Sequence, residues 1–83
     1  MSEKMPVVSG KTLIHFLESM GYEVARQRGS HVRLVKSTMA GNHKITIPNH
    51  NPVAKGTLSD ILSKVSLWCQ IDKQHLAARL KEF

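Results

Sequence analysis

The sequence predicts an α+β fold, in which a three-stranded antiparallel sheet carries helices on one face in the order α-β-β-β-α, followed by a C-terminal helix. Segments near both ends of the 83-residue chain space their apolar residues as helices do, and three segments between them alternate apolar and polar residues. The chain contains no repeat and no Pro/Gly-rich linker, and its length allows one domain. We therefore expect a flexible tail over residues 1–8 and a single domain over residues 9–83.

Three helices are predicted from their caps and apolar stripes. Ser9 can cap the first helix and Gly21 can end it. The second helix is predicted to begin at Thr57, because Thr57 and Asp60 have the spacing of a capping box, and Asp72 can cap the third. The apolar stripes of the three helices are Leu13, Phe16, Leu17 and Met20; Leu58, Ile61, Leu62 and Val65; and Leu76, Leu80 and Phe83.

Three strands lie between the first two helices. Residues 22–28, 31–36 and 43–48 contain β-branched residues and alternate apolar with polar side chains, a pattern that favours strands. Gly29 and Ser30 suit a tight turn between the first two strands, whereas Ser37–Asn42 suits a longer hairpin loop between the second and third.

Strand alternation predicts which side chains share the face that the helices leave open. If Val32 and Leu34 point toward the helices, their neighbours must point away. Alternation points the side chains of Arg26 and Arg28 toward the core, so we expect them to reach solvent at the end of the strand. The predicted open face carries Gln27, His31, Arg33, Lys44 and Thr46.

Charge and composition narrow the classes of function. The formal net charge is +6, and residues 22–50 alone contribute +4, together with three of the five histidines. A small basic domain of this kind typically binds a polyanion, first of all a nucleic acid. No apolar run is long enough to span a membrane, and a single cysteine, Cys69, cannot form an internal disulfide, so we expect a cytoplasmic protein without a membrane association.

His31 is the candidate catalytic residue. An imidazole can exchange protons near neutral pH, and flanking cations can hold a scissile phosphate and stabilise its transition state. Residues 24–59 contain no carboxylate, which argues against a divalent-metal nuclease, so no metal and no cofactor is expected. A plain surface histidine remains the structural alternative. The predicted RNA contacts are Gln27, Arg28, Ser30, Arg33, Lys44 and Lys55, the last at the start of the second helix.

Several of these segments, in this order, are similar to the HicA family of bacterial and archaeal toxins. The resemblance covers about residues 7–66 and rests on Ser9-Gly10-Lys11, Gly21-Tyr22, Arg26-Gln27-Arg28-Gly29-Ser30-His31, Ile45-Thr46-Ile47-Pro48, Lys55-Gly56-Thr57-Leu58 and Ile61-Leu62. It implies a fold like that of double-stranded-RNA-binding domains and a ribonuclease (mRNA interferase) of a type II toxin–antitoxin pair. It also implies catalysis by the histidine of Gly-Ser-His, which is His31 here, and a HicB-type antitoxin that covers the active surface.

Two features depart from that family. The hairpin loop Ser37–Asn42 looks longer than the family's tight turn, and the segment Ser66–Phe83 has no family role. This segment can pack against the core, dimerise or contact the antitoxin, and the oligomeric state is not predicted. Two other functions stay open: a non-catalytic RNA-binding module that uses the same basic face, and an interaction domain that docks an acidic partner.

Overall fold

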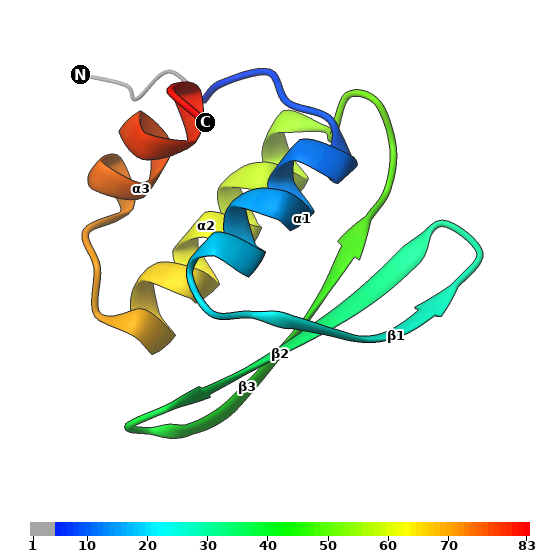
Figure 1. Cartoon of the computed structure of the whole chain (residues 1–83). Helices are drawn as coiled ribbons and strands as arrows, with labels where there is room; N and C mark the ends of the chain where they lie inside the picture. Colours follow the sequence, from blue (N-terminus) through cyan, green and yellow to red (C-terminus); the bar gives the residue numbers. More distant parts are fainter. Residues whose placement is uncertain (1–4) are drawn as a thin grey trace.

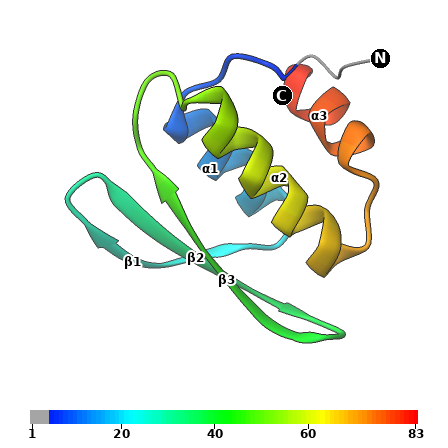
Figure 2. The same cartoon turned by 180° about the vertical axis from the view of Figure 1, so that it is seen from behind.

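The predicted order of elements is confirmed by the computed structural model, which describes residues 5–83. The elements are α1 (Gly10–Ser19), β1 (Glu23–Arg28), β2 (His31–Thr38), β3 (Gly41–Pro48), α2 (Lys55–Cys69) and α3 (Lys73–Lys81) (Figure 1). The three strands form one antiparallel sheet in the order β1-β2-β3. Both views show α1 and α2 side by side over one face of this sheet, with α3 beside α2 (Figures 1 and 2).

Two of the predicted helix caps are confirmed. The Ser9 hydroxyl accepts a hydrogen bond from the Thr12 N–H at 3.1 Å, and the Asp72 carboxylate accepts one from the His75 N–H at 3.2 Å. Each bond satisfies a backbone donor that the first turn of a helix leaves without an intrahelical partner.

The predicted capping box of the second helix is wrong. α2 begins at Lys55, two residues before the expected start, with Ala54 at the cap position and no side-chain capping bond. Thr57 therefore lies inside the helix, and Asp60 forms an exposed ion pair with Lys64 at 2.9 Å instead of folding back. The spacing of a capping box therefore does not by itself fix the first residue of a helix, whose position varies by one or two residues.

The expected long hairpin loop is also absent. Pairing of β2 with β3 continues through Ser37↔Asn42 to Thr38↔Gly41, so only Met39 and Ala40 form the turn. The Thr38 hydroxyl supports this turn by accepting a hydrogen bond from the Ala40 N–H at 3.2 Å. Polar residues with low strand propensity are carried into the ladder here by the register of the strands before them.

The core lies between the helices and the covered face of the sheet. Val32, Leu34, Ile45 and Ile47 are buried, as the alternation predicted. α3 adds Leu76, Ala77 and Leu80, so much of the segment after residue 66 packs against the core. The core consists of Leu13, Ile14, Phe16, Leu17, Tyr22, Val32, Leu34, Ile45, Ile47, Val53, Leu58, Ile61, Leu62, Val65, Leu76, Ala77 and Leu80.

The first four residues of the predicted tail lie outside the described residues. Of the remainder, Met5 and Val8 pack against the core, and the Val8 carbonyl accepts a hydrogen bond from the Val53 N–H at 2.9 Å. Within residues 5–83, the helices are too short or too polar to traverse a lipid bilayer.

Candidate active site

A β-bulge in β1 determines which side chains occupy the open face of the sheet. Val24 pairs with Leu34, but the next pair is Arg26↔Arg33, so Ala25 is an extra residue without a partner. A bulge of this kind reverses the alternation of the residues that follow it. The side chains of Arg26 and Arg28 consequently lie on the open face, with Arg33 and His31 opposite them.

Four basic side chains surround a hollow on that face. The hollow has a volume of about 200 Å³ and is lined by Arg26, Arg28, His31, Arg33 and Thr46; we call it the arginine–histidine hollow. All five side chains are exposed, and their positions follow from the pairs Arg26↔Arg33, Arg28↔His31 and Arg33↔Thr46. The sheet thus gathers three guanidinium groups and one imidazole from β1 and β2, and β3 adds Thr46.

The turn before His31 fixes where β2 begins. Gly29 has φ +58° in the two-residue turn between Arg28 and His31, a conformation that suits glycine at the first position of a type II′ turn. His31 is the first residue of β2 and pairs with Arg28 on one side and Pro48 on the other. Its backbone is therefore held by both neighbouring strands, while its side chain stays exposed.

Three other predicted RNA contacts, Ser30, Lys44 and Lys55, do not line the arginine–histidine hollow. Ser30 is exposed in the turn directly before His31. Lys44 lies on the open face opposite Val35, two pairs beyond Thr46 and outside the hollow. Lys55 is exposed at the start of α2 and does not line the hollow.

Gln27 is not on the predicted face. The bulge pairs Gln27 with Val32, so its side chain points to the helix side of the sheet, where it lines a separate hollow with Lys11, Ile14 and His15. The prediction that Gln27 shares a face with His31 is wrong, and so is the expectation that Arg26 and Arg28 must escape at a strand end. One feature of the sequence indicates the bulge. Strict alternation would point the side chains of Arg26 and Arg28 toward the core, where burial of two charges is too costly, so the alternation must break before Arg26.

The composition of the arginine–histidine hollow decides what it can bind. It holds three fixed positive charges and no carboxylate, so it attracts an anion and repels a cation. Guanidinium groups bind phosphate oxygens with two parallel hydrogen bonds, and the imidazole is a group that can accept or donate a proton there. Among residues 5–83, no three His, Cys, Asp or Glu side chains are clustered as a metal site requires.

A second cluster lies at the opposite end of β2, near the hairpin turn. The Tyr22 hydroxyl and His43 Nδ1 share a buried hydrogen bond at 2.8 Å, and the His43 ring stacks on the Trp68 ring with centroids 4.9 Å apart. Cys69 Sγ lies 3.6 Å from the same hydroxyl. These contacts join β3 to the C-terminal end of α2.

Burial shifts the pKa of both titratable groups in this cluster. Desolvation raises the pKa of Tyr22 above its ordinary range, and the bond to Cys69 acts in the same direction. Desolvation also lowers the pKa of His43 below its ordinary value, with a smaller contribution from the charge of Lys64. Both groups are therefore neutral at physiological pH, as expected for side chains that hold a core together.

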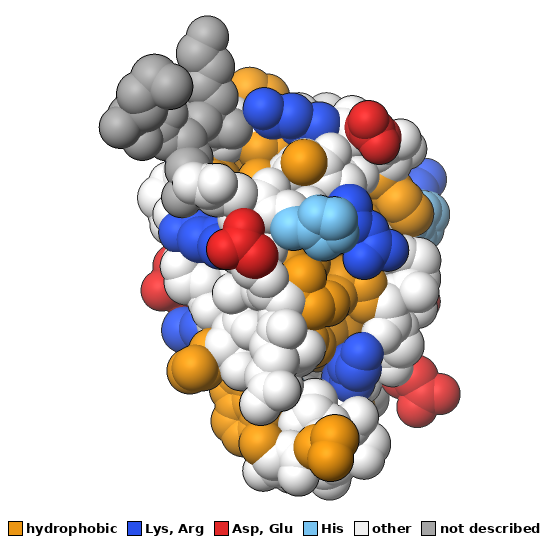
Figure 3. Space-filling model, turned by 90° about the vertical axis from the view of Figure 1, so that its left-hand side faces the viewer, with side chains coloured by type: hydrophobic (Ala, Val, Ile, Leu, Met, Phe, Trp, Pro, Cys, Tyr) orange, Lys and Arg blue, Asp and Glu red, His pale blue; other side chains and the backbone are white. Residues whose placement is uncertain are grey.

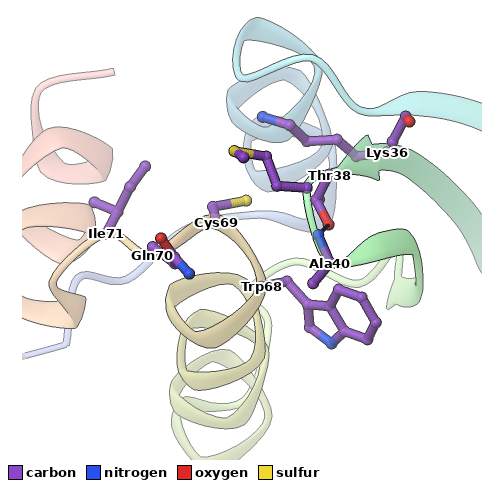
Figure 4. A pocket seen from close by; sticks show the side chains of 9 residues that line it. Lys36, Thr38, Ala40, Trp68, Cys69, Gln70 and Ile71 are labelled. Atoms are coloured by element: carbon purple, nitrogen blue, oxygen red, sulfur yellow. Dashed lines mark hydrogen bonds between the residues drawn. The ribbon is translucent and has the colours of Figure 1, made fainter.

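A hollow of about 300 Å³ lies beside this cluster. Side chains of the hairpin and of the end of α2 face each other across it, among them Thr38 and Ala40 on one side and Trp68 and Cys69 on the other (Figure 4). The space-filling view of this side shows hydrophobic side chains gathered in the middle of the face, with Lys and Arg side chains beside them (Figure 3). The lining contains one cation, Lys36, whose ammonium group donates a hydrogen bond to the Met20 carbonyl at the end of α1.

Comparison with known proteins gives one match. The family model described as "HicA toxin of bacterial toxin-antitoxin" matches residues 10–67, well over half of the chain. The matched range includes the bulge, the Gly-Ser-His turn and every residue that lines the arginine–histidine hollow. No match is found among curated proteins or among solved structures.

Proposed function

The chain belongs to the HicA toxin family of bacterial toxin–antitoxin systems, and from that premise we propose that it is an endoribonuclease that cleaves messenger RNA at the arginine–histidine hollow. The observation that carries the proposal is the grouping of Arg26, Arg28 and Arg33 around His31 on an open sheet face. A phosphodiester bound by these guanidiniums lies next to the one side chain of the hollow that can move a proton.

The proposed chemistry uses the nucleophile that RNA itself supplies. His31 accepts the proton of a ribose 2′-hydroxyl, the 2′-oxygen forms a bond to phosphorus, and the bond from phosphorus to the 5′-oxygen breaks. The imidazolium formed in the first step returns the proton to the departing 5′-oxygen. The products are a 2′,3′-cyclic phosphate and a 5′-hydroxyl, and the arginines stabilise the extra negative charge on the phosphoryl oxygens in the transition state.

The hollow supports a reaction that does not require a divalent metal. A magnesium site is built from carboxylate and carbonyl oxygens, whereas the groups that line this hollow are three guanidiniums, an imidazole and a threonine. The guanidiniums occupy the electrostatic role that a metal ion has in many nucleases. We therefore propose a metal-independent enzyme without a cofactor.

The open face also suggests how the toxin is controlled. The hollow is exposed and strongly cationic, so a partner that covers it with acidic side chains would exclude RNA. We propose a HicB-type antitoxin as that partner and the cytoplasm, where messages are translated, as the compartment. The exposed sheet face is accessible to single-stranded or locally unpaired RNA.

Induced expression in bacteria tests the proposal. We expect wild-type protein to arrest growth and deplete transcripts, and we expect His31→Ala, produced at the same level, to do neither. Arg79→Ala is the matched control, because Arg79 is an exposed cation on α3, away from the sheet. Arrest by His31→Ala as strong as by wild type would refute the proposed role of His31, and arrest with intact transcripts would refute ribonuclease activity.

A further inference from the structure

We propose that Gly10 is a positioning residue for His31, acting through the loop that follows β3. The inference rests on the proposed function, because it concerns the geometry of the same histidine. Gly10 is buried at the start of α1, and its own backbone lies in the helical region. Alanine has the higher helix propensity at such a position, so a reason other than local conformation must account for the glycine.

That reason is a close approach of two backbones. The Gly10 N–H donates a hydrogen bond to the His50 carbonyl at 2.7 Å. A Cβ atom at Gly10 would lie 2.6 Å from both the Cα of Asn49 and the carbonyl oxygen of Pro48, and 3.0 Å from the Asn49 side-chain oxygen. The first two neighbours are backbone atoms, so rotation of a side chain cannot relieve the overlap. Any side chain at position 10 must push residues 48–49 away from α1.

The displaced residues are those that hold His31. The Asn49 N–H donates a hydrogen bond to the Ser30 carbonyl at 2.6 Å, and this carbonyl belongs to the peptide that joins Ser30 to His31. Pro48, the preceding residue, is the β3 partner of His31. The backbone of His31 is therefore connected to α1 through two contacts: Ser30 with Asn49, and His50 with Gly10.

Two of the three arginines lie farther from this connection than Arg28, which pairs with His31 itself. Arg26 and Arg33 pair with each other across β1 and β2, and Arg33 pairs with Thr46, two residues before Pro48. Crowding at Gly10 therefore shifts the imidazole relative to a phosphate that Arg26 and Arg33 still hold. Since a shift of about 1 Å between a substrate and a catalytic group can lower a rate by about 100-fold, a loss in kcat with little change in KM is the expected signature.

The test compares Gly10→Ala with Gly56→Ala in cleavage of a short fluorogenic RNA. Both glycines lie in the first turn of a helix, but a Cβ at Gly56 would meet no atom within 4 Å. We expect Gly10→Ala to lower kcat at least about tenfold with KM unchanged within about twofold, and Gly56→Ala to retain both values. Equal kcat in wild type and Gly10→Ala would overturn the inference.

A second measurement keeps the inference separate from the activity. The Cε1–H signal of the His31 imidazole in a proton–carbon NMR correlation spectrum is expected to move in Gly10→Ala, whereas that of His75 on α3 stays in place. If wild type fails to cleave RNA, the proposed function fails, and this signal still decides the role of Gly10. An unmoved His31 signal refutes that role.

Asn49→Pro provides a second way to break the connection. It removes the N–H that is donated to Ser30 and leaves position 10 as glycine. The same loss in kcat and the same movement of the His31 signal are expected. If Gly10→Ala does not fold, Asn49→Pro tests the inference alone. A lowered kcat together with a moved His31 signal supports the inference, and a wild-type kcat with an unmoved signal overturns it.

Discussion

Among single residues, Ala25 has a large effect on the open face although it has no partner in the strand pairing. By standing unpaired in β1 it turns Arg26 and Arg28 to the open face and Gln27 to the helix side. Sequence alternation predicted His31 and Arg33 on the open face but placed Arg26 and Arg28 on the core side, because the bulge has no glycine or proline to mark its position and only the cost of burying two arginines indicates it. The residues with the strongest conformational signals, Gly29 and Ser9, were predicted correctly.

Neighbouring substitutions at the bulge test this assignment. We expect Arg26→Gln to weaken binding of a non-cleavable 2′-O-methyl RNA about tenfold, because a charge-assisted hydrogen bond contributes about 1.5–3 kcal/mol. Gln27→Ala, one residue away and on the other side of the sheet, is expected to change the affinity less than twofold, a change of about 0.4 kcal/mol. Fluorescence anisotropy measures both. An equal loss in the two variants would show that the bulge does not separate their faces in solution.

At the scale of elements, the hairpin and the two C-terminal helices show what the sequence could not predict. The turn at Met39–Ala40 lacks the usual turn residues. The polar residues on both sides of it favour a loop in the sequence, but strand pairing continues through them. The segment after residue 66 offered three alternatives, of which packing against the core is observed for Leu76 and Leu80. Weak local signals of this kind are overridden by tertiary contacts, which a sequence pattern does not contain.

Removing a buried side chain of α3 tests whether this helix is integral to the fold. Leu80 is almost completely buried, so Leu80→Ala is expected to lower the free energy of unfolding by about 2–5 kcal/mol. Gln74→Ala, at an exposed position of the same helix, is expected to change it by less than about 0.5 kcal/mol. Chemical denaturation followed by tryptophan fluorescence measures both values. A small loss for Leu80→Ala would mean that α3 detaches in solution.

The contact of the hairpin with α2 predicts a dependence of stability on pH. Burial lowers the pKa of His43 below its value in the unfolded chain, near 6.5, so protons bind the unfolded state more readily in this range. The stability that comes from keeping the His43 imidazole neutral and buried is fully present above the pKa of the unfolded chain. It is lost as the pH falls toward the lower pKa that His43 has in the folded protein. His43→Gln is expected to flatten the decline in melting temperature below about pH 6.5, where an unperturbed imidazole is mostly protonated.

Exposed His75 supplies the control for this experiment. His75→Gln changes another imidazole on α3 without touching the cluster of Tyr22, His43 and Trp68. The slope of melting temperature against pH should then match that of wild type. If His43→Gln keeps the wild-type slope as well, the buried imidazole is not the group that titrates.

At the scale of the whole molecule, the excess of six positive charges is distributed unevenly, and the fold places part of it on one surface. The helices cover the other face of the sheet (Figure 2). The arginines of β1 and β2 meet on the uncovered face. In the proposed function, this charge attracts RNA at long range. The proposed cleavage depends on the single imidazole among those charges, and the match to the HicA toxin family covers every residue that lines the hollow.

Salt dependence distinguishes this surface from the remaining positive charge. We expect Arg33→Ala to reduce the slope of the logarithm of RNA affinity against the logarithm of salt concentration by about 0.7, the value for one phosphate contact on a single strand. Arg79→Ala removes the same charge from α3 and should leave the slope unchanged. Equal reductions in both variants would indicate that RNA binds through net charge alone.

The proposal that His31 transfers protons in RNA cleavage without a metal is tested by a cleavage assay with purified protein. A 5′-labelled RNA is incubated in EDTA with purified wild type or His31→Ala, and the rate and the end groups of the products are determined. We predict that wild type leaves 2′,3′-cyclic phosphates and that His31→Ala is slower by about 10²-fold or more, with RNA affinity retained. Equal cleavage by His31→Ala, or cleavage by wild type only after Mg²⁺ is added, would contradict it.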